Sequence, residues 1–119
     1  MRIRWFPLTS WKAPQPNIIG ACALFNTPAF AAKPSFNCSK ATHEIEKLIC
    51  SDDELAALDV SLNDLYKAVL KNTPAAAQKR LKTEQIGWSK GRNDCWKAGD
   101  KRDCVKGEYE TRINELKDR

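Results

Sequence analysis

The sequence lacks most of the groups from which catalytic sites are built. Its 119 residues include a single histidine, His43, and contain neither the phosphate-binding G-x-x-x-x-G-K-[ST] motif nor the G-x-S-x-G motif of serine nucleophiles. A nucleophilic pair of His43 with Cys38 or Cys50, or a zinc ion held by these three residues, would compete with disulfide formation. We therefore predict that the protein is not an enzyme and has no catalytic residue, metal or cofactor.

Signals for β-strands are also absent, because the sequence has no run of alternating β-branched residues, no internal repeat and no low-complexity tract. An apolar content of 42% in so short a chain allows one modest core, which disulfides would have to support. The expected fold class is all-α. We predict a small disulfide-stapled helical domain with a long helical hairpin, a short N-terminal helix and a C-terminal helix.

Residues 1–31 contain three basic residues and no acidic one, and their apolar run, residues 18–30, is too short to span a bilayer. The run ends in Ala29-Phe30-Ala31, which has the small residues of a signal-peptidase cleavage site. These features predict a signal peptide cleaved after Ala31, followed by one domain over residues 32–119. The expected location is periplasmic or secreted, with no transmembrane segment. Acylation of Cys22, which would make the protein a lipoprotein, is the alternative.

The charge of the chain is modest and unevenly distributed. Three of the five net positive charges lie in residues 1–31, and the remaining +2 is too weak to indicate a nucleic-acid partner. Residues 38–66 carry seven acidic and two basic side chains, whereas residues 67–107 carry eleven basic and four acidic ones. Either the flanks of the two long helices attract each other in the hairpin, or one end of the domain is an acidic docking surface and another end a basic one.

Four cysteines remain after the predicted cleavage site: Cys38, Cys50, Cys95 and Cys104. An even number in a small exported domain predicts two disulfides. Local pairing, Cys38 with Cys50 and Cys95 with Cys104, closes short loops and is favoured. The crossed pairing, Cys50 with Cys95 and Cys38 with Cys104, stays open because two long helices in a hairpin could bring these residues together.

Two helix starts are predicted near the middle of the chain. Thr42 can cap a short helix over residues 43–50. Ser51 and Glu54 stand three apart, as in a capping box, and predict the start of a long helix over residues 52–71. Leucines in this long helix recur at steps of three and four, so that one apolar stripe faces a partner helix.

Further along, Thr73 is expected to cap a second long helix over residues 74–97, with the proline that follows Thr73 in the first helical position. This arrangement predicts a tight helical hairpin. Asp100 can then start a third helix that runs to Leu116. Ahead of the first cysteine, the polar residues 33–37 are expected to form an extended tail.

The second long helix has two unusual features. Gly87 and Gly91 each lower helix stability, but at a spacing of four they form a smooth strip on which another helix could pack closely. Trp88 and Arg92 share one helical face, so the guanidinium can lie against the indole and reach a buried carboxylate. The pair is either a structural anchor or an interface hot spot. Trp96 is expected to be more exposed and to be available to a partner.

Four segments of the sequence resemble the N-terminal domain of the LprI lysozyme-inhibitor family of bacterial envelope proteins: "CSKATHEIEKLIC", "SDDELAALDVSLNDLYKAVL", "EQIGWSKGRNDC" and "CVKGEYETRINEL". The resemblance covers about residues 35–116. The matching residues are the four cysteines and a framework that consists of Leu55, Leu58, Asp59, Leu62, Tyr66, Trp88, Arg92, Tyr109, Arg112 and Ile113. The resemblance implies a helical, disulfide-linked envelope domain and, for the namesake of the family, inhibition of lysozyme.

Common lysozymes are basic and cleave glycan with carboxyl groups in a cleft, so an inhibitor gains from a negative surface. We therefore predict that Glu44, Asp52, Asp53 and Glu54 face lysozyme, with the basic helix turned away from the enzyme. The alternative is a non-enzymatic periplasmic protein-interaction module with no lysozyme activity, which would bind its partner through Trp96 and the basic flank.

Overall fold

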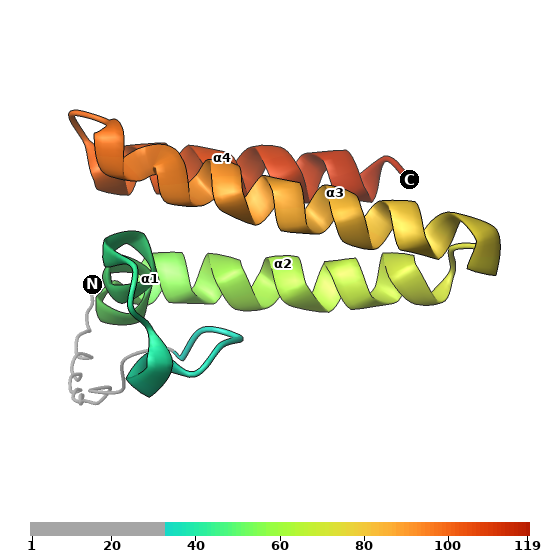
Figure 1. Cartoon of the computed structure of the whole chain (residues 1–119), viewed down its shortest axis with the longest axis horizontal. Helices are drawn as coiled ribbons and strands as arrows, with labels where there is room; N and C mark the ends of the chain where they lie inside the picture. Colours follow the sequence, from blue (N-terminus) through green and yellow to red (C-terminus); the bar gives the residue numbers. More distant parts are fainter. Residues whose placement is uncertain (1–32) are drawn as a thin grey trace, which may run out of the picture. The chain divides into compact units, whose positions relative to one another are not determined.

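The computed structural model describes residues 33–119, so the predicted signal peptide, its cleavage site and Cys22 lie outside the described residues. Within this range the chain forms α-helices and short 3-10 helices, and no β-strand (Figure 1). The elements are η4 (Cys38–Lys40), α1 (Glu44–Ser51), α2 (Asp53–Lys71), α3 (Ala75–Asn93), η5 (Asp94–Lys97) and α4 (Lys101–Lys117). The prediction of an all-α fold is confirmed. No helix in this part of the chain is long and apolar enough to cross a membrane.

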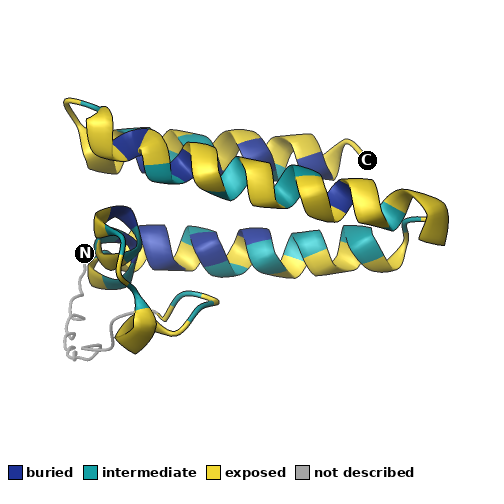
Figure 2. Ribbon diagram, in the orientation of Figure 1, coloured by how far each residue is buried: buried dark blue, intermediate teal, exposed yellow. Residues whose placement is uncertain are grey.

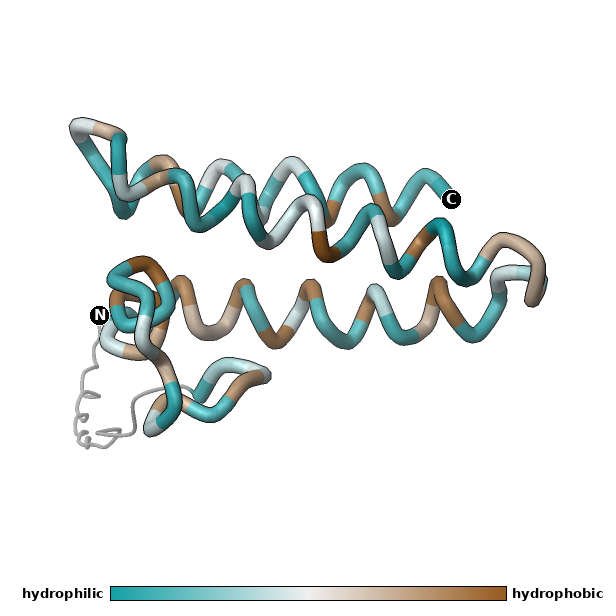
Figure 3. The backbone as a smooth tube through the Cα atoms, in the orientation of Figure 1, coloured by the Kyte–Doolittle hydropathy of each residue, from teal (hydrophilic) through white to brown (hydrophobic). Residues whose placement is uncertain are grey.

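The apolar stripe of α2 is covered mainly by α4. The helices α2 and α3 form the predicted hairpin, and α4 then runs beside α2 in the same direction (Figure 1). Helix α3 buries one apolar side chain, that of Leu81, whereas α4 buries Val105, Tyr109 and Leu116. Figure 3 shows the same contrast, because hydrophobic positions recur along α2 while α3 is mostly hydrophilic. Since apolar burial drives helix packing, α2 packs more extensively against α4 than against α3.

The core lies toward the α1 end of the domain. Ile45 and Ile49 of α1 pack with Leu55 and Leu62 from the first half of α2, and each of these side chains is at most 2% exposed. In the second half of α2, the apolar residues Leu65, Val69 and Leu70 are only half-buried. Figure 2 shows intermediate and exposed positions in this half of the helix. Full burial of such a side chain contributes about 1.5–3 kcal/mol, so the α1 end holds most of the apolar stabilisation.

Two helix caps differ from the sequence-based prediction. The N-cap of α1 is His43 and not Thr42, because the His43 Nδ1 atom accepts the backbone N–H two residues further along at 3.0 Å. At the hairpin, Pro74 occupies the N-cap position of α3 and offers no side-chain acceptor. Thr73 instead donates its hydroxyl to the carbonyl oxygen of Val69 at 2.6 Å, so it closes the end of α2 rather than starting α3.

The second long helix is shorter than predicted and carries its glycines on an open face. The α-helical part ends at Asn93, and the chain continues as the 3-10 helix η5. Gly87 and Gly91 are both exposed, and a Cβ atom added at either position would meet no other atom within 4 Å. The prediction that another helix packs closely on Gly87 and Gly91 is therefore wrong for the described part of the chain. Each glycine lowers helix stability by about 1 kcal/mol relative to alanine without a packing contact in return.

The disulfides follow the local pairing that the cysteine spacing favours. Cys38 is bonded to Cys50 and Cys95 to Cys104, with an S–S length of 2.06 Å in both bonds. The crossed pairing is wrong. The first disulfide joins η4 to the end of α1, and the second joins η5 to the first turn of α4. Both short elements are thereby fixed to neighbouring helices.

Candidate functional site

The acidic turn at the start of α2 is the part of the sequence for which partner binding was predicted. The chain changes direction at Asp52, whose backbone is extended, while Ser51 still belongs to α1. The Asp52 Oδ1 atom accepts the backbone N–H of Leu55 at 3.0 Å, and the Ser51 hydroxyl donates to the carbonyl oxygen of Leu48. Asp52 is therefore the N-cap of α2, and the predicted capping box of Ser51 with Glu54 is wrong.

Two cations of α4 lie against this acidic turn. Arg102 donates from Nε to the Oδ2 atom of Asp52 at 2.5 Å and also forms an ion pair with Glu54. The Lys106 Nζ atom lies 3.2 Å from the Oε2 atom of Glu54. The first turns of α2 and α4 meet because the two helices run side by side in the same direction. Arg102 and Lys106 belong to the basic stretch that was expected to face away from lysozyme, yet they lie against the acidic turn.

These ion pairs change the acid–base properties of the turn. The hydrogen bond from Arg102 is the largest effect on Asp52 and holds the pKa of its carboxyl below the ordinary value, while burial opposes this shift. The hydrogen bonds from Arg102 and Lys106 likewise lower the pKa of Glu54. A carboxyl with a lower pKa in the folded chain stabilises the fold above its ordinary pKa. This contribution is lost as the pH falls through the folded value, so stability should decrease below about pH 4.

The substitution Asp52→Asn should flatten this dependence on pH. The asparagine can still cap α2, but it carries no charge for Arg102, so the variant should be less stable than the parent near neutral pH. At about pH 2 the difference should be smaller, because more of the parent carboxyl is protonated there than at neutral pH. Urea unfolding at both pH values measures the effect, with Asp64→Asn on the exposed face of α2 as the control. An acid-induced loss of stability in Asp52→Asn as large as that in the parent would contradict the prediction.

The other residues predicted to contact a partner lie at the same end of the bundle. Glu44 is exposed in the first turn of α1, and Asp53 is the exposed first residue of α2. Trp96 lies in η5, which packs against α1, and its side chain is 46% exposed. The Nζ atom of Lys97 lies 5.8 Å from the centroid of the Trp96 ring. This end of the domain therefore carries charges of both signs around an exposed tryptophan, and it is not a uniformly acidic surface.

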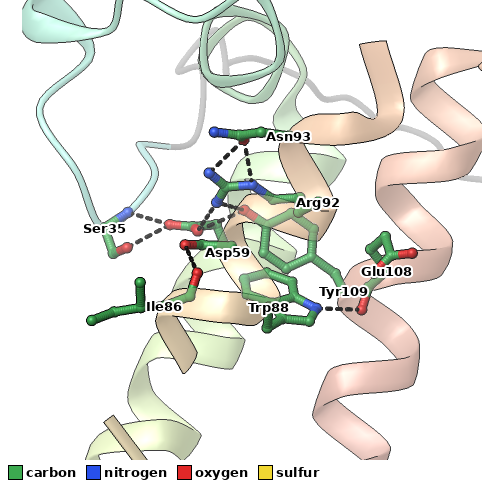
Figure 4. A network of polar contacts seen from close by, with 9 residues as sticks. Ser35, Asp59, Ile86, Trp88, Arg92, Asn93, Glu108 and Tyr109 are labelled. Carbon is green, nitrogen blue, oxygen red and sulfur yellow. Dashed lines mark hydrogen bonds and ion pairs between the residues drawn. The ribbon is translucent and has the colours of Figure 1, made fainter. Parts of the chain in front are cut away.

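A buried polar network holds the middle of the bundle together (Figure 4). Asp59, which is 5% exposed, accepts hydrogen bonds at 2.6 Å from both the backbone N–H and the hydroxyl of Ser35. Its other oxygen accepts the phenol O–H of Tyr109 at 2.7 Å. Burial, reinforced by the nearby Asp59 charge, raises the pKa of Tyr109 well above its usual range. The phenol therefore stays protonated and continues to donate to Asp59.

Arg92 supplies the positive charge of this network. Its Nη1 atom donates to the Tyr109 hydroxyl at 3.1 Å and lies 4.0 Å from the Oδ1 atom of Asp59. The guanidinium also lies 5.5 Å from the centroid of the Trp88 ring and donates two hydrogen bonds to the side chain of Asn93. The predicted contact of Arg92 with the indole, and its approach to a buried carboxylate, are both present. The buried position of Arg92, which is 7% exposed, supports the interpretation as a structural anchor.

The remaining framework residues are also parts of the packed interior. Leu55 and Leu62 are buried, and three further residues, Leu58, Tyr66 and Ile113, are partly buried against the same core. Arg112, which is 5% exposed, donates to Gln85 at 2.9 Å and pairs with Glu115 at 3.1 Å. The resemblance residues are therefore parts of the packed core or of the polar contacts around it.

Three contributors to these contacts were not identified from the sequence. The sequence predicts that Ser35 lies in an extended tail, and nothing in the sequence links it to a carboxylate 24 positions away. The sequence places Arg102 and Lys106 only within the basic stretch of residues 67–107. Both residues lie in the first two turns of a helix that starts at Asp100, and a parallel neighbouring helix places them beside the start of α2.

The described residues hold no group of three or more histidine, cysteine, aspartate or glutamate side chains that could bind a metal ion. Their buried charges are paired within the network around Asp59 or with surface carboxylates. The arrangement can stabilise a rigid surface and present it to another protein.

A protein-family model described as "Lysozyme inhibitor LprI" matches residues 38–116, which include both disulfides and nearly all of the buried network. The chain belongs to this family. Lipoprotein LprI of Mycobacterium bovis is 33% identical over 103 residues, which cover 83% of this chain and 50% of the relative. Lipoprotein LprI of Mycobacterium tuberculosis strains CDC 1551 and H37Rv matches equally well. The chain thus spans about half the length of these curated relatives.

No solved structure shows a significant match to this LprI-family chain. The relatives are named as lipoproteins, and the two disulfides of the present chain are typical of proteins outside the cytoplasm. Both observations favour an extracytoplasmic location for the LprI-family domain. The signal peptide over residues 1–31 and the domain boundary at residue 32 stay predictions.

Proposed function

We propose that the protein binds lysozyme and inhibits it. The observation that carries this proposal is the match of the lysozyme-inhibitor family model from the first disulfide cysteine to the last turn of α4. The matched region is the whole helical bundle, so the similarity concerns a complete folded unit and not one short motif. A rigid, disulfide-linked bundle without an assigned catalytic group is suited to blocking another protein by occupying its surface.

We further propose that the inhibitory surface is the end of the bundle formed by α1 and η5. Tryptophan is enriched among the residues that dominate binding energy at interfaces, and Trp96 is 46% exposed at this end. The exposed carboxylates of Glu44 and Asp53 would favour approach to a basic enzyme. Asp52 and Glu54 have a different role in this proposal, since they hold Arg102 and thereby fix the first turn of α4.

The oxidised full-length protein should slow the clearing of a cell-wall suspension by lysozyme at a near-stoichiometric ratio. Trp96→Ala should raise the concentration needed for half-inhibition by roughly tenfold or more, because truncation of a central aromatic residue removes a large part of interface energy. The matched control is Ile86→Ala, which truncates an exposed apolar residue on α3 that is 58% accessible. Unchanged clearing at a tenfold excess of the protein would overturn the proposed function and favour an interaction module without lysozyme activity.

A further inference from the structure

A shallow groove runs along the seam between α2 and α4, away from the acidic turn and the buried polar network. Leu58, Ser61 and Leu65 of α2 line one wall, and Glu110, Ile113 and Lys117 of α4 line the other. The leucines and Ile113 are only partly buried by the core, so apolar surface remains accessible along the groove. We refer to this surface as the α2/α4 groove.

The residues that line the α2/α4 groove have the same seven-residue spacing on both helices. On α2, Leu58 and Leu65 are seven residues apart, and the small residue Ser61 lies between them. On α4, Glu110 and Lys117 are also seven residues apart, with Ile113 between them. Seven residues correspond to two helical turns, or about 10.5 Å, so the members of each set lie on one face of their helix.

The two charges at the ends of the α4 pattern are opposite in sign and unused within the chain. Glu110 and Lys117 are both exposed. Neither forms an ion pair in the described part of the chain, where the salt bridges of α4 involve Arg102, Lys106 and Arg112. In an antiparallel packing of two α4 helices about Ile113, Glu110 of each copy would lie beside Lys117 of the other. The charges are therefore complementary to a second copy of the same surface.

We propose that two copies of this chain associate through the α2/α4 groove about a two-fold axis. The axis crosses α2 near Ser61 and α4 near Ile113, so that α2 packs on α2 and α4 on α4 of the other copy, each pair antiparallel. Leu58 then faces Leu65 of the second copy, and Ser61 allows the two α2 helices to approach closely. Such a self-complementary patch gives a closed dimer. Because the patch is small, we expect a weak dimer with a dissociation constant in roughly the micromolar range.

Sedimentation velocity of the oxidised full-length protein over a wide range of concentrations tests the proposal. The expected result is a shift from monomer to dimer mass as the concentration rises. Glu110→Lys and Lys117→Glu should each weaken the dimer by roughly tenfold or more, because each substitution brings like charges together across the axis. The double variant Glu110→Lys/Lys117→Glu should restore association close to that of the parent.

The matched control is Lys82→Glu, a charge reversal at an exposed position on α3 that should leave the dissociation constant unchanged. Circular dichroism establishes that each variant remains helical. A monomer at every concentration, as expected if the groove takes a helix of an unrelated protein, would overturn the proposal. A double variant that associates as weakly as the single variants would also overturn it. Lysozyme inhibition is measured separately and does not enter this test.

Discussion

The substitution Asp59→Ala should lower the free energy of unfolding by about 3–5 kcal/mol, because it leaves a buried charge without its partner. In the native protein the carboxylate accepts two hydrogen bonds from Ser35 and one from Tyr109, and it lies 4.0 Å from Arg92. Alanine would remove all of these acceptors and the charge that faces Arg92, which is 7% exposed in the native protein. Chemical denaturation followed by circular dichroism measures the loss.

Two further variants separate the role of the charge from the general cost of substitution in α2. Asp59→Asn keeps the size of the side chain and one acceptor, so it should destabilise the protein less than Asp59→Ala. Asp64→Ala removes an exposed carboxylate from the same helix and should change stability by about 0.5 kcal/mol or less. A loss below about 1 kcal/mol for Asp59→Ala would contradict a structural role for the network.

Loss of both disulfides should leave most of the chain unfolded at room temperature. The loops closed by Cys38–Cys50 and Cys95–Cys104 span 12 and 9 residues, and loop entropy assigns each bond about 3 kcal/mol. The sum is comparable to the total stability of a small domain, which is typically about 5–15 kcal/mol. Circular dichroism of the oxidised protein and of the protein in excess reductant should therefore show folded and largely unfolded spectra, respectively.

Paired substitutions distinguish the two bonds. Replacing Cys95 and Cys104 with alanine should destabilise the protein more than replacing Cys38 and Cys50, because Cys95 is 2% exposed within the core whereas Cys38 is exposed. Urea unfolding of both double variants gives the two free-energy changes. Equal stability of the reduced and oxidised proteins would show that the helical core alone is sufficient and would contradict the prediction.

The contacts of Arg102 change the interpretation of the acidic turn. The sequence suggested a negative surface for a basic enzyme, but Asp52 and Glu54 are neutralised by Arg102 and Lys106. A surface with charges of both signs gains less from long-range attraction and depends more on its exposed aromatic residue. Trp96 therefore becomes the central residue of the proposed lysozyme contact, and the acidic turn becomes part of its support.

Several structural features could be predicted because they depend on short-range patterns. The leucine spacing of α2 placed that helix within one or two residues of its observed bounds, and Asp100 was correctly assigned as the start of α4. The local disulfide pairing followed from loop length. The helix caps were less predictable, since Thr42, His43, Ser51 and Asp52 can all accept a backbone hydrogen bond. The caps are His43 and Asp52, because the backbone is extended at these two positions immediately before each helix begins.

The sequence by itself determined the helical class, the cysteine spacing, the family framework and the absence of recognisable catalytic motifs, because each of these depends on residue identity and local periodicity. Only the tertiary structure decided which helix covers α2, which cations meet the acidic turn and that Ser35 hydrogen-bonds to Asp59. Those contacts join residues that are 24 to 50 positions apart. Their partners are selected by how the apolar stripes of all four helices pack together, and no local pattern encodes that choice.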